Sequence, residues 1–219
     1  MSSNKVFALL RKEFTLEWRQ KFAIGGVLLY LVSAVFLAYL AFDGMIPLNT
    51  WNALYWLIML FAAMNAILKS FIQEHDSRQM YYYSLVSARD YIGAKILYNA
   101  LLMIVLGLTG LVVFFAFMGN PLNSPWIFLA NMIFGMLGFA AVLTLVSAIA
   151  SRVRNSFTLM AVLGFPLVLP LLLLLIRVSA ASIKGAGFLS VAPDLLIIAL
   201  LVLISLVLSM LLFPYIWRE

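Results

Sequence analysis

Long apolar runs separated by short polar segments dominate the chain. Six of these runs cover Phe22–Phe42, Trp51–Ile72, Ile96–Met118, Trp126–Ala150, Phe157–Ile176 and Leu195–Phe213. About 20 apolar residues in a helix cross the hydrocarbon core of a bilayer. Lys69 is the one charged residue within these bounds, and near the end of its run its side chain can reach the membrane surface. The pattern predicts an all-α integral membrane protein with six transmembrane helices.

The composition indicates that lipid surrounds most of the side chains. The chain has 219 residues, of which 66% are hydrophobic and 10% charged, whereas a soluble domain carries roughly 25% charged residues. A soluble fold of this size could not bury so much apolar surface in one core. The runs leave no stretch long enough for a separate soluble domain, so we expect residues 1–219 to form a single transmembrane domain.

The basic residues gather on one predicted side of the membrane. Twelve of the fourteen Lys and Arg residues lie on this side, and Arg177 and Lys184 lie on the other. The twelve are Lys5, Arg11, Lys12, Arg19, Lys21, Lys69, Arg78, Arg89, Lys95, Arg152, Arg154 and Arg218. Cytoplasmic loops are enriched in Lys and Arg, so this distribution predicts that both termini are cytoplasmic. The net charge of +6 therefore reflects orientation in a membrane, and no basic stripe with interleaved aromatics predicts binding to nucleic acid.

The N-terminal segment, residues 4–20, has the pattern of an amphipathic helix. Val6, Leu10, Phe14 and Trp18 recur every four residues, while most of the charged residues fall elsewhere around the helix. A basic amphipathic helix of this kind lies in the plane of the lipid headgroups. Two roles fit the pattern, a simple membrane anchor and an elbow helix that also contacts a cytoplasmic partner.

The longest polar stretch between runs is residues 73–95, on the predicted cytoplasmic side. Ser87 and Asp90 form an S-x-x-D capping pattern, which predicts that the third transmembrane helix begins near Ala88. Upstream lies a run of three tyrosines, Tyr81, Tyr82 and Tyr83. Tyrosine offers a large contact area at low entropic cost, so the loop is a candidate docking segment; the alternative is that these tyrosines belong to the interfacial aromatic belt.

Prolines mark two further places. Pro166 and Pro170 lie four residues apart in the fifth run, and each removes a backbone donor and strains a helix around it. A functional hinge and a static kink both fit this spacing. Pro193, followed by Asp194, predicts the first turn of the last helix, with a substrate-facing carboxylate at Asp194 as the alternative.

Residue types that perform chemistry are scarce. The chain has no cysteine, and its one histidine, His75, lies between Glu74 and Asp76 in a polar loop. We therefore expect no transition-metal site and no cofactor bound by this chain. No G-x-x-x-x-G-K-[ST] motif is present, so a transporter built on this chain would take its energy from another polypeptide. We expect a non-catalytic membrane subunit.

Several of these features resemble ABC-2 permeases, and more narrowly the CcmB family of haem exporter permeases of cytochrome c maturation. The ABC-2 resemblance rests on the amphipathic N-terminal segment, the six runs and SLVSARDYIGAKIL at Ser84–Leu97. The narrower one rests on FPLVLPLLLLLI at Phe165–Ile176, on Leu145–Gly164 before it, and on the overall length. The loop after the second run departs from the family pattern, because Ser77–Arg78 and tyrosines replace acidic residues, Asp-Gly and prolines.

The resemblance implies a permease in the bacterial cytoplasmic (inner) membrane that pairs with itself and with two copies of a cytoplasmic ABC ATPase. It also implies work with a haem-handling membrane protein and a periplasmic haem chaperone. By this resemblance residues 4–20, with Leu10, Phe14 and Trp18, form the elbow helix, and Pro166 and Pro170 break the fifth helix. The implied ATPase-coupling residues are Glu74, Arg78, Tyr81, Tyr82, Tyr83 and Arg89.

Two alternatives remain on the sequence. One keeps the ABC-2 class with a lipid, polysaccharide or drug as cargo. The other is a membrane-embedded lipid-modifying enzyme, for which the adjacent residues Glu74, His75 and Asp76 would be the candidate cluster. Neighbouring residues on a helix point in different directions, which makes this cluster a poor catalytic constellation. Within the leading hypothesis, the absence of a histidine in the membrane runs leaves haem ligation to the partners.

Overall fold

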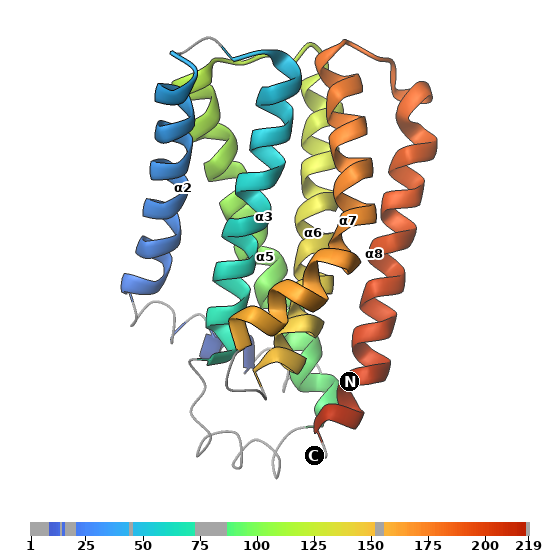
Figure 1. The fold of residues 1–219 in the computed structure, drawn as a ribbon. Coiled ribbons are helices and arrows are strands. Elements are labelled where there is room, and N and C mark those ends of the chain that lie inside the picture. The colour runs from blue at the N-terminus through green and yellow to red at the C-terminus, as the bar shows by residue number, and fades with distance from the viewer. Residues whose placement is uncertain are drawn as a thin grey trace.

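The structure, a computed structural model, describes residues 9–13, 15, 21–43, 46–72, 87–151 and 156–217. Residues 9–13 and 15 are helical. The long helices run up and down beside one another (Figure 1), and they are α2 (Lys21–Ala41), α3 (Leu48–Ile72), α5 (Ala88–Met118), α6 (Pro125–Ala150), α7 (Ser156–Ile183) and α8 (Phe188–Trp217). The all-helical prediction is confirmed for the residues described.

Five of these helices, α3, α5, α6, α7 and α8, are long and apolar enough to cross a membrane. The described apolar part of α2 is shorter and covers Gly25–Ala41. The chain is therefore a multi-pass membrane protein, and the sixth span remains a prediction that rests on α2.

Helices α3 and α6 form the centre of the bundle. In their most apolar stretches, 72% of the residues of α3 and 78% of those of α6 are buried, against 22–33% in α5, α7 and α8. Helix α6 packs against α3, α5, α7 and α8, whereas α2 lies at the margin against α3 and α5. The outer helices expose many large apolar side chains, such as Val112, Leu173 and Leu203, as expected where hydrocarbon is the solvent.

Close contact around α6 depends on glycine. A methyl group at Gly135 would lie 2.8 Å from two ring carbons of Trp56 and 2.9 Å from Leu175, and one at Gly138 would lie 2.5 Å from Leu171. Small residues let neighbouring helices approach closely in membrane proteins. These two glycines therefore set the distance between α6 and its neighbours α3 and α7.

Two predicted boundaries are corrected by the structure, and a third is confirmed. Helix α7 continues to Ile183, beyond the predicted end at Ile176, so Arg177 lies on this helix. Helix α8 already begins at Phe188, so Pro193 lies inside it and does not start it. Helix α5 begins at Ala88, as the capping pattern predicts, so residues 88–95 of the polar stretch 73–95 are helical, and a coupling role for the stretch stays a prediction.

Pro166 and Pro170 both lie inside α7, which continues through them. Figure 1 shows the first part of α7 running obliquely across the bundle and the later part running along it. A proline in a helix interior removes a backbone hydrogen bond and clashes with the preceding turn, which bends the helix. The helix is bent but not ended by the prolines, and a role as a moving hinge remains a prediction.

Candidate functional site

Three segments that are distant in sequence meet around the side chain of Lys95, at the end of the bundle where α3 ends and α5 begins. The ammonium group of Lys95 donates to Oε2 of Glu13 at 2.9 Å and to the backbone carbonyl of Ser70 at 2.7 Å. It also lies 5.2 Å from the centre of the Phe71 ring. Lys95 is 1% exposed and Glu13 is 7% exposed. One buried ammonium group thus joins the N-terminal segment, α3 and α5.

The sequence places each group where it can take part. Ser70 lies in the last turn of α3, where backbone carbonyls have no partner within the helix. The positive charge of Lys95 therefore satisfies an orphan carbonyl and complements the negative end of the helix dipole, and the face of Phe71 adds a cation–π contact. On the other side of Glu13, the ammonium group of Lys12 lies 3.2 Å from Oε1.

The start of α5 is fixed independently. The hydroxyl oxygen of Ser87 accepts from the backbone N–H of Asp90 at 3.2 Å and donates to its carboxylate at 2.8 Å. One residue later, Tyr91 packs against Phe213 and Trp217 near the end of α8, with ring centres 5.8 and 4.7 Å apart. The first two turns of α5 are therefore anchored to α8 as well as to α3 and the N-terminal segment.

A second polar network crosses the core of the bundle nearer the opposite end. The amide of Asn131 and the indole N–H of Trp56 both donate to the hydroxyl of Ser179 at 2.8 Å. The amide of Asn52 donates to the carbonyl of Ile176 at 2.8 Å. These bonds tie α3 and α6 to α7 beyond its bend, and buried polar contacts of this kind help to specify helix packing in a membrane.

Comparison with protein families gives a match. A profile described as CcmB protein matches residues 4–217, almost the whole chain. The chain belongs to the CcmB family. Comparison with individual curated proteins finds no significant match.

Membership of the CcmB family confirms the predicted resemblance. CcmB proteins are non-catalytic permease subunits of an ABC transporter for cytochrome c maturation, and the family works with an ABC ATPase. Among the residues described, no group of three His, Asp or Glu side chains could hold a metal ion.

Most of the predicted site residues fall outside the part of this CcmB chain that the structure describes. Arg89 is described and is exposed in the first turn of α5, and Leu10 is half-buried in the N-terminal segment. Pro166 and Pro170 lie in α7. The residues outside the described part are Glu74, Arg78, Tyr81, Tyr82 and Tyr83 in the loop and Phe14 and Trp18 in the N-terminal segment.

The pairing of Lys95 with Glu13 does not follow from the sequence pattern. The position of Lys95 before an apolar run predicts a basic residue that orients the helix, yet its side chain is buried in this CcmB protein. The signal that was available is the position of Lys95 seven residues inside a helix whose start is marked by Ser87. A lysine at that depth needs a partner, but nothing in the local sequence points to Glu13, 82 residues away.

Helix α8 begins at Phe188, so Asp194 does not lie in its first turn as predicted, and the alternative of a substrate-facing role stays a prediction for its carboxylate. It lies 3.1 Å from Nε of Arg177, which is 73% exposed, so the pair links α7 to α8 at the end opposite Lys95. The pair is open to the surroundings on its arginine side alone, because the side chain of Asp194 is 17% exposed.

Proposed function

We propose that this CcmB chain is the membrane half of an ABC-2-type transporter that handles haem for cytochrome c maturation. In this proposal the chain crosses the bacterial cytoplasmic membrane six times, with both termini in the cytoplasm. Helix α2 has 21 residues, or about 31 Å at 1.5 Å per residue, which is enough to cross the hydrocarbon core. The family match and the basic residues at one end of the bundle support this arrangement.

The observation that carries the mechanism is the buried contact of Lys95 with Glu13 and Ser70. The segment between α3 and α5 is the proposed seat of the ATPase. Its two flanking helices are joined by Lys95, and the N-terminal elbow segment is joined to them by Glu13. A push on this segment would therefore move α3, α5 and the elbow together, so that closure of an ATPase pair rocks the helices of a permease homodimer.

The cargo belongs to the same proposal. The chain supplies no histidine to the membrane runs, so haem ligation falls to a haem-handling membrane protein and a periplasmic haem chaperone. ATP then either moves haem across the membrane or releases the haem-loaded chaperone. An ABC-2 permease for a lipid, polysaccharide or drug is the competing function, and intact c-type cytochromes in a deletion strain would favour it.

Charge reversal at Arg89 tests the coupling. Arg89 is exposed in the first turn of α5, so Arg89→Glu should leave the fold intact while it repels a docking surface that fits a cation. We expect the variant to lose most of the cytochrome c yield and to weaken co-purification of the ATPase. Lys184→Glu, an exposed site at the opposite end, is the matched control and should match the unaltered chain.

The outcomes are distinct. Co-purification of an ATPase with the unaltered chain and with Lys184→Glu, but less with Arg89→Glu, supports the coupling surface. If no ATPase co-purifies with the unaltered chain, or if Arg89→Glu supports full ATPase coupling, the proposed mechanism is wrong.

A further inference from the structure

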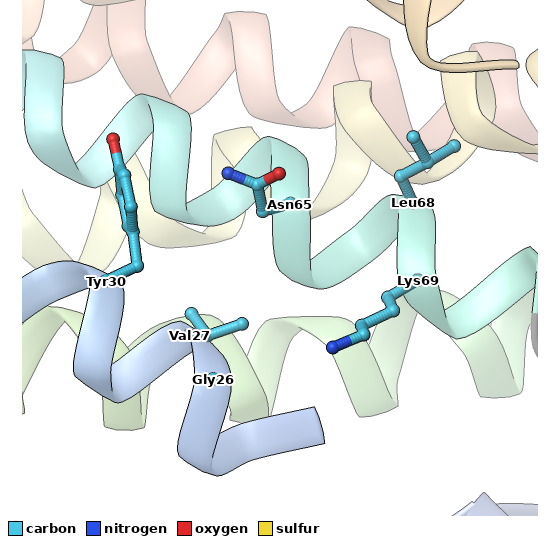
Figure 2. Close-up of a pocket in the computed structure, with 6 residues that line it drawn as sticks. All are labelled: Gly26, Val27, Tyr30, Asn65, Leu68 and Lys69. Carbon is cyan, nitrogen blue, oxygen red and sulfur yellow. The ribbon is translucent and has the colours of Figure 1, made fainter. Parts of the chain in front are cut away.

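A groove of about 420 Å³ lies between α2 and α3, beside the end of the bundle that holds Lys95. Its lining is formed by Gly26, Val27, Tyr30, Asn65, Leu68 and Lys69 (Figure 2). The volume is within the range of ligand pockets, roughly 300–1,000 Å³. The groove is separate from the buried contact of Lys95 and plays no part in the coupling proposed above.

The groove holds one positive charge that no described residue neutralises. Lys69 is exposed and forms no ion pair with any residue in the described part of the chain. Figure 2 shows its side chain reaching from α3 toward Gly26 of α2. A methyl group added at Gly26 would lie 3.9 Å from the Lys69 nitrogen, so the absence of a side chain there keeps the space around the ammonium group open.

The polar and apolar groups are ordered by depth. Lys69 lies three residues before the end of α3, about 4.5 Å from the end of the helix, which is near enough for a lysine side chain to extend to the lipid headgroups. Asn65 lies four residues before Lys69 in α3, and Tyr30 lies four residues after Gly26 in α2. Each is about 6 Å further from this end of the bundle. The remaining lining, Val27 and Leu68, is apolar.

This order matches the chemistry of an anionic phospholipid. The geometry points to a specific site for one such lipid, with its phosphate at Lys69, its glycerol ester carbonyls near the amide of Asn65 and the hydroxyl of Tyr30, and its acyl chains along Val27 and Leu68. Charge complementarity selects the anionic headgroup over a zwitterionic one. The amide of Asn65 donates one hydrogen to the carbonyl of Phe61 at 3.0 Å, which leaves its second hydrogen and the hydroxyl of Tyr30 to meet the ester region one turn below the headgroups.

The test is native mass spectrometry of the purified full-length chain in detergent, with phosphatidylglycerol or phosphatidylethanolamine added. Two variants attack the site in different ways. Lys69→Met removes the charge, and Gly26→Leu fills the groove while the charge remains. The matched controls are Lys184→Met, which removes an exposed cation at the other end, and Gly25→Leu, which adds the same side chain where no other atom lies within 4 Å.

We expect the unaltered chain to retain phosphatidylglycerol in preference to phosphatidylethanolamine. Lys69→Met should reduce the retained phosphatidylglycerol about fivefold, which corresponds to one lysine near an anionic lipid, and Gly26→Leu should reduce it at least as much. Both controls should retain it. Equal retention by all four variants, or equal retention of the two lipids by the unaltered chain, would overturn the assignment; thermal unfolding of each variant confirms that it is folded.

Discussion

Lys95 is 1% exposed, and burial of its charged side chain costs free energy of desolvation. Contacts with three residues offset this cost. Glu13 supplies the opposite charge, Ser70 supplies an otherwise unpaired carbonyl, and Phe71 supplies the face of a ring. Burying an ion pair is expensive and is repaid only where the remaining hydrogen-bonding capacity is satisfied. The contact therefore fixes how α3, α5 and the N-terminal segment sit against one another more than it adds net stability.

A double-mutant cycle tests this contact. Glu13→Gln removes the carboxylate that faces the buried ammonium group of Lys95, and Lys95→Met leaves Glu13 with Lys12 as its counter-charge. Each change should destabilise the chain, by at most about 3–5 kcal/mol. The double variant should cost less than the sum of the two by about 1–3 kcal/mol, because it removes both charges. Unfolding of the purified chain measured by tryptophan fluorescence gives these values, and strictly additive effects would contradict the assigned pair.

The same residue shows the limit of prediction from sequence. A lysine just before a long apolar run is expected to orient the helix in the membrane, and that expectation says nothing about a partner elsewhere. Lys95 is buried in a contact with Glu13, which lies 82 residues earlier in the sequence. Local pattern cannot reveal such a contact, whereas the Ser87 cap is local and was predicted correctly.

At the scale of the helices, the length of an apolar run predicts which segments are helical, but it does not predict the residues at which each helix begins and ends. Arg177 marked the predicted end of the fifth helix, yet α7 continues to Ile183 because an arginine near the surface can point outward without ending the helix. Pro193 marked a helix start, but α8 accommodates it five residues after its first residue. Charged residues and prolines locate the membrane boundary better than they locate the helix boundary.

The close packing of α6 against α3 can be tested by adding one methyl group to α6. Gly135→Ala places a methyl group against the ring of Trp56, which is held by its hydrogen bond to Ser179 and cannot easily move. We expect a loss of about 1–3 kcal/mol, typical of overpacking. Gly164→Ala is the control, because its methyl group would lie 3.5 Å from Leu143, an ordinary contact. The midpoints of unfolding in detergent should separate the two, and equal midpoints would contradict the close approach of α3 and α6.

At the scale of the whole molecule, the two ends of the bundle differ in kind. Among the described residues, one end gathers six basic residues, whereas the other holds the Arg177–Asp194 pair and Lys184. The six are Arg11, Lys12, Lys21, Lys69, Arg89 and Lys95. This asymmetry, together with the family match, supports a cytoplasmic end that receives the ATPase and an opposite end that faces the periplasm. The proposed function depends on that orientation.

Cysteine labelling in intact cells measures the orientation directly, because the chain has no cysteine of its own. Single substitutions Asn49→Cys, Lys184→Cys and Arg89→Cys place a thiol at exposed positions before α3 crosses, after α7 and at the start of α5. A membrane-impermeant maleimide should label the first two in intact cells and Arg89→Cys only after permeabilisation. Labelling of Arg89→Cys in intact cells, with the other two protected, would contradict the account.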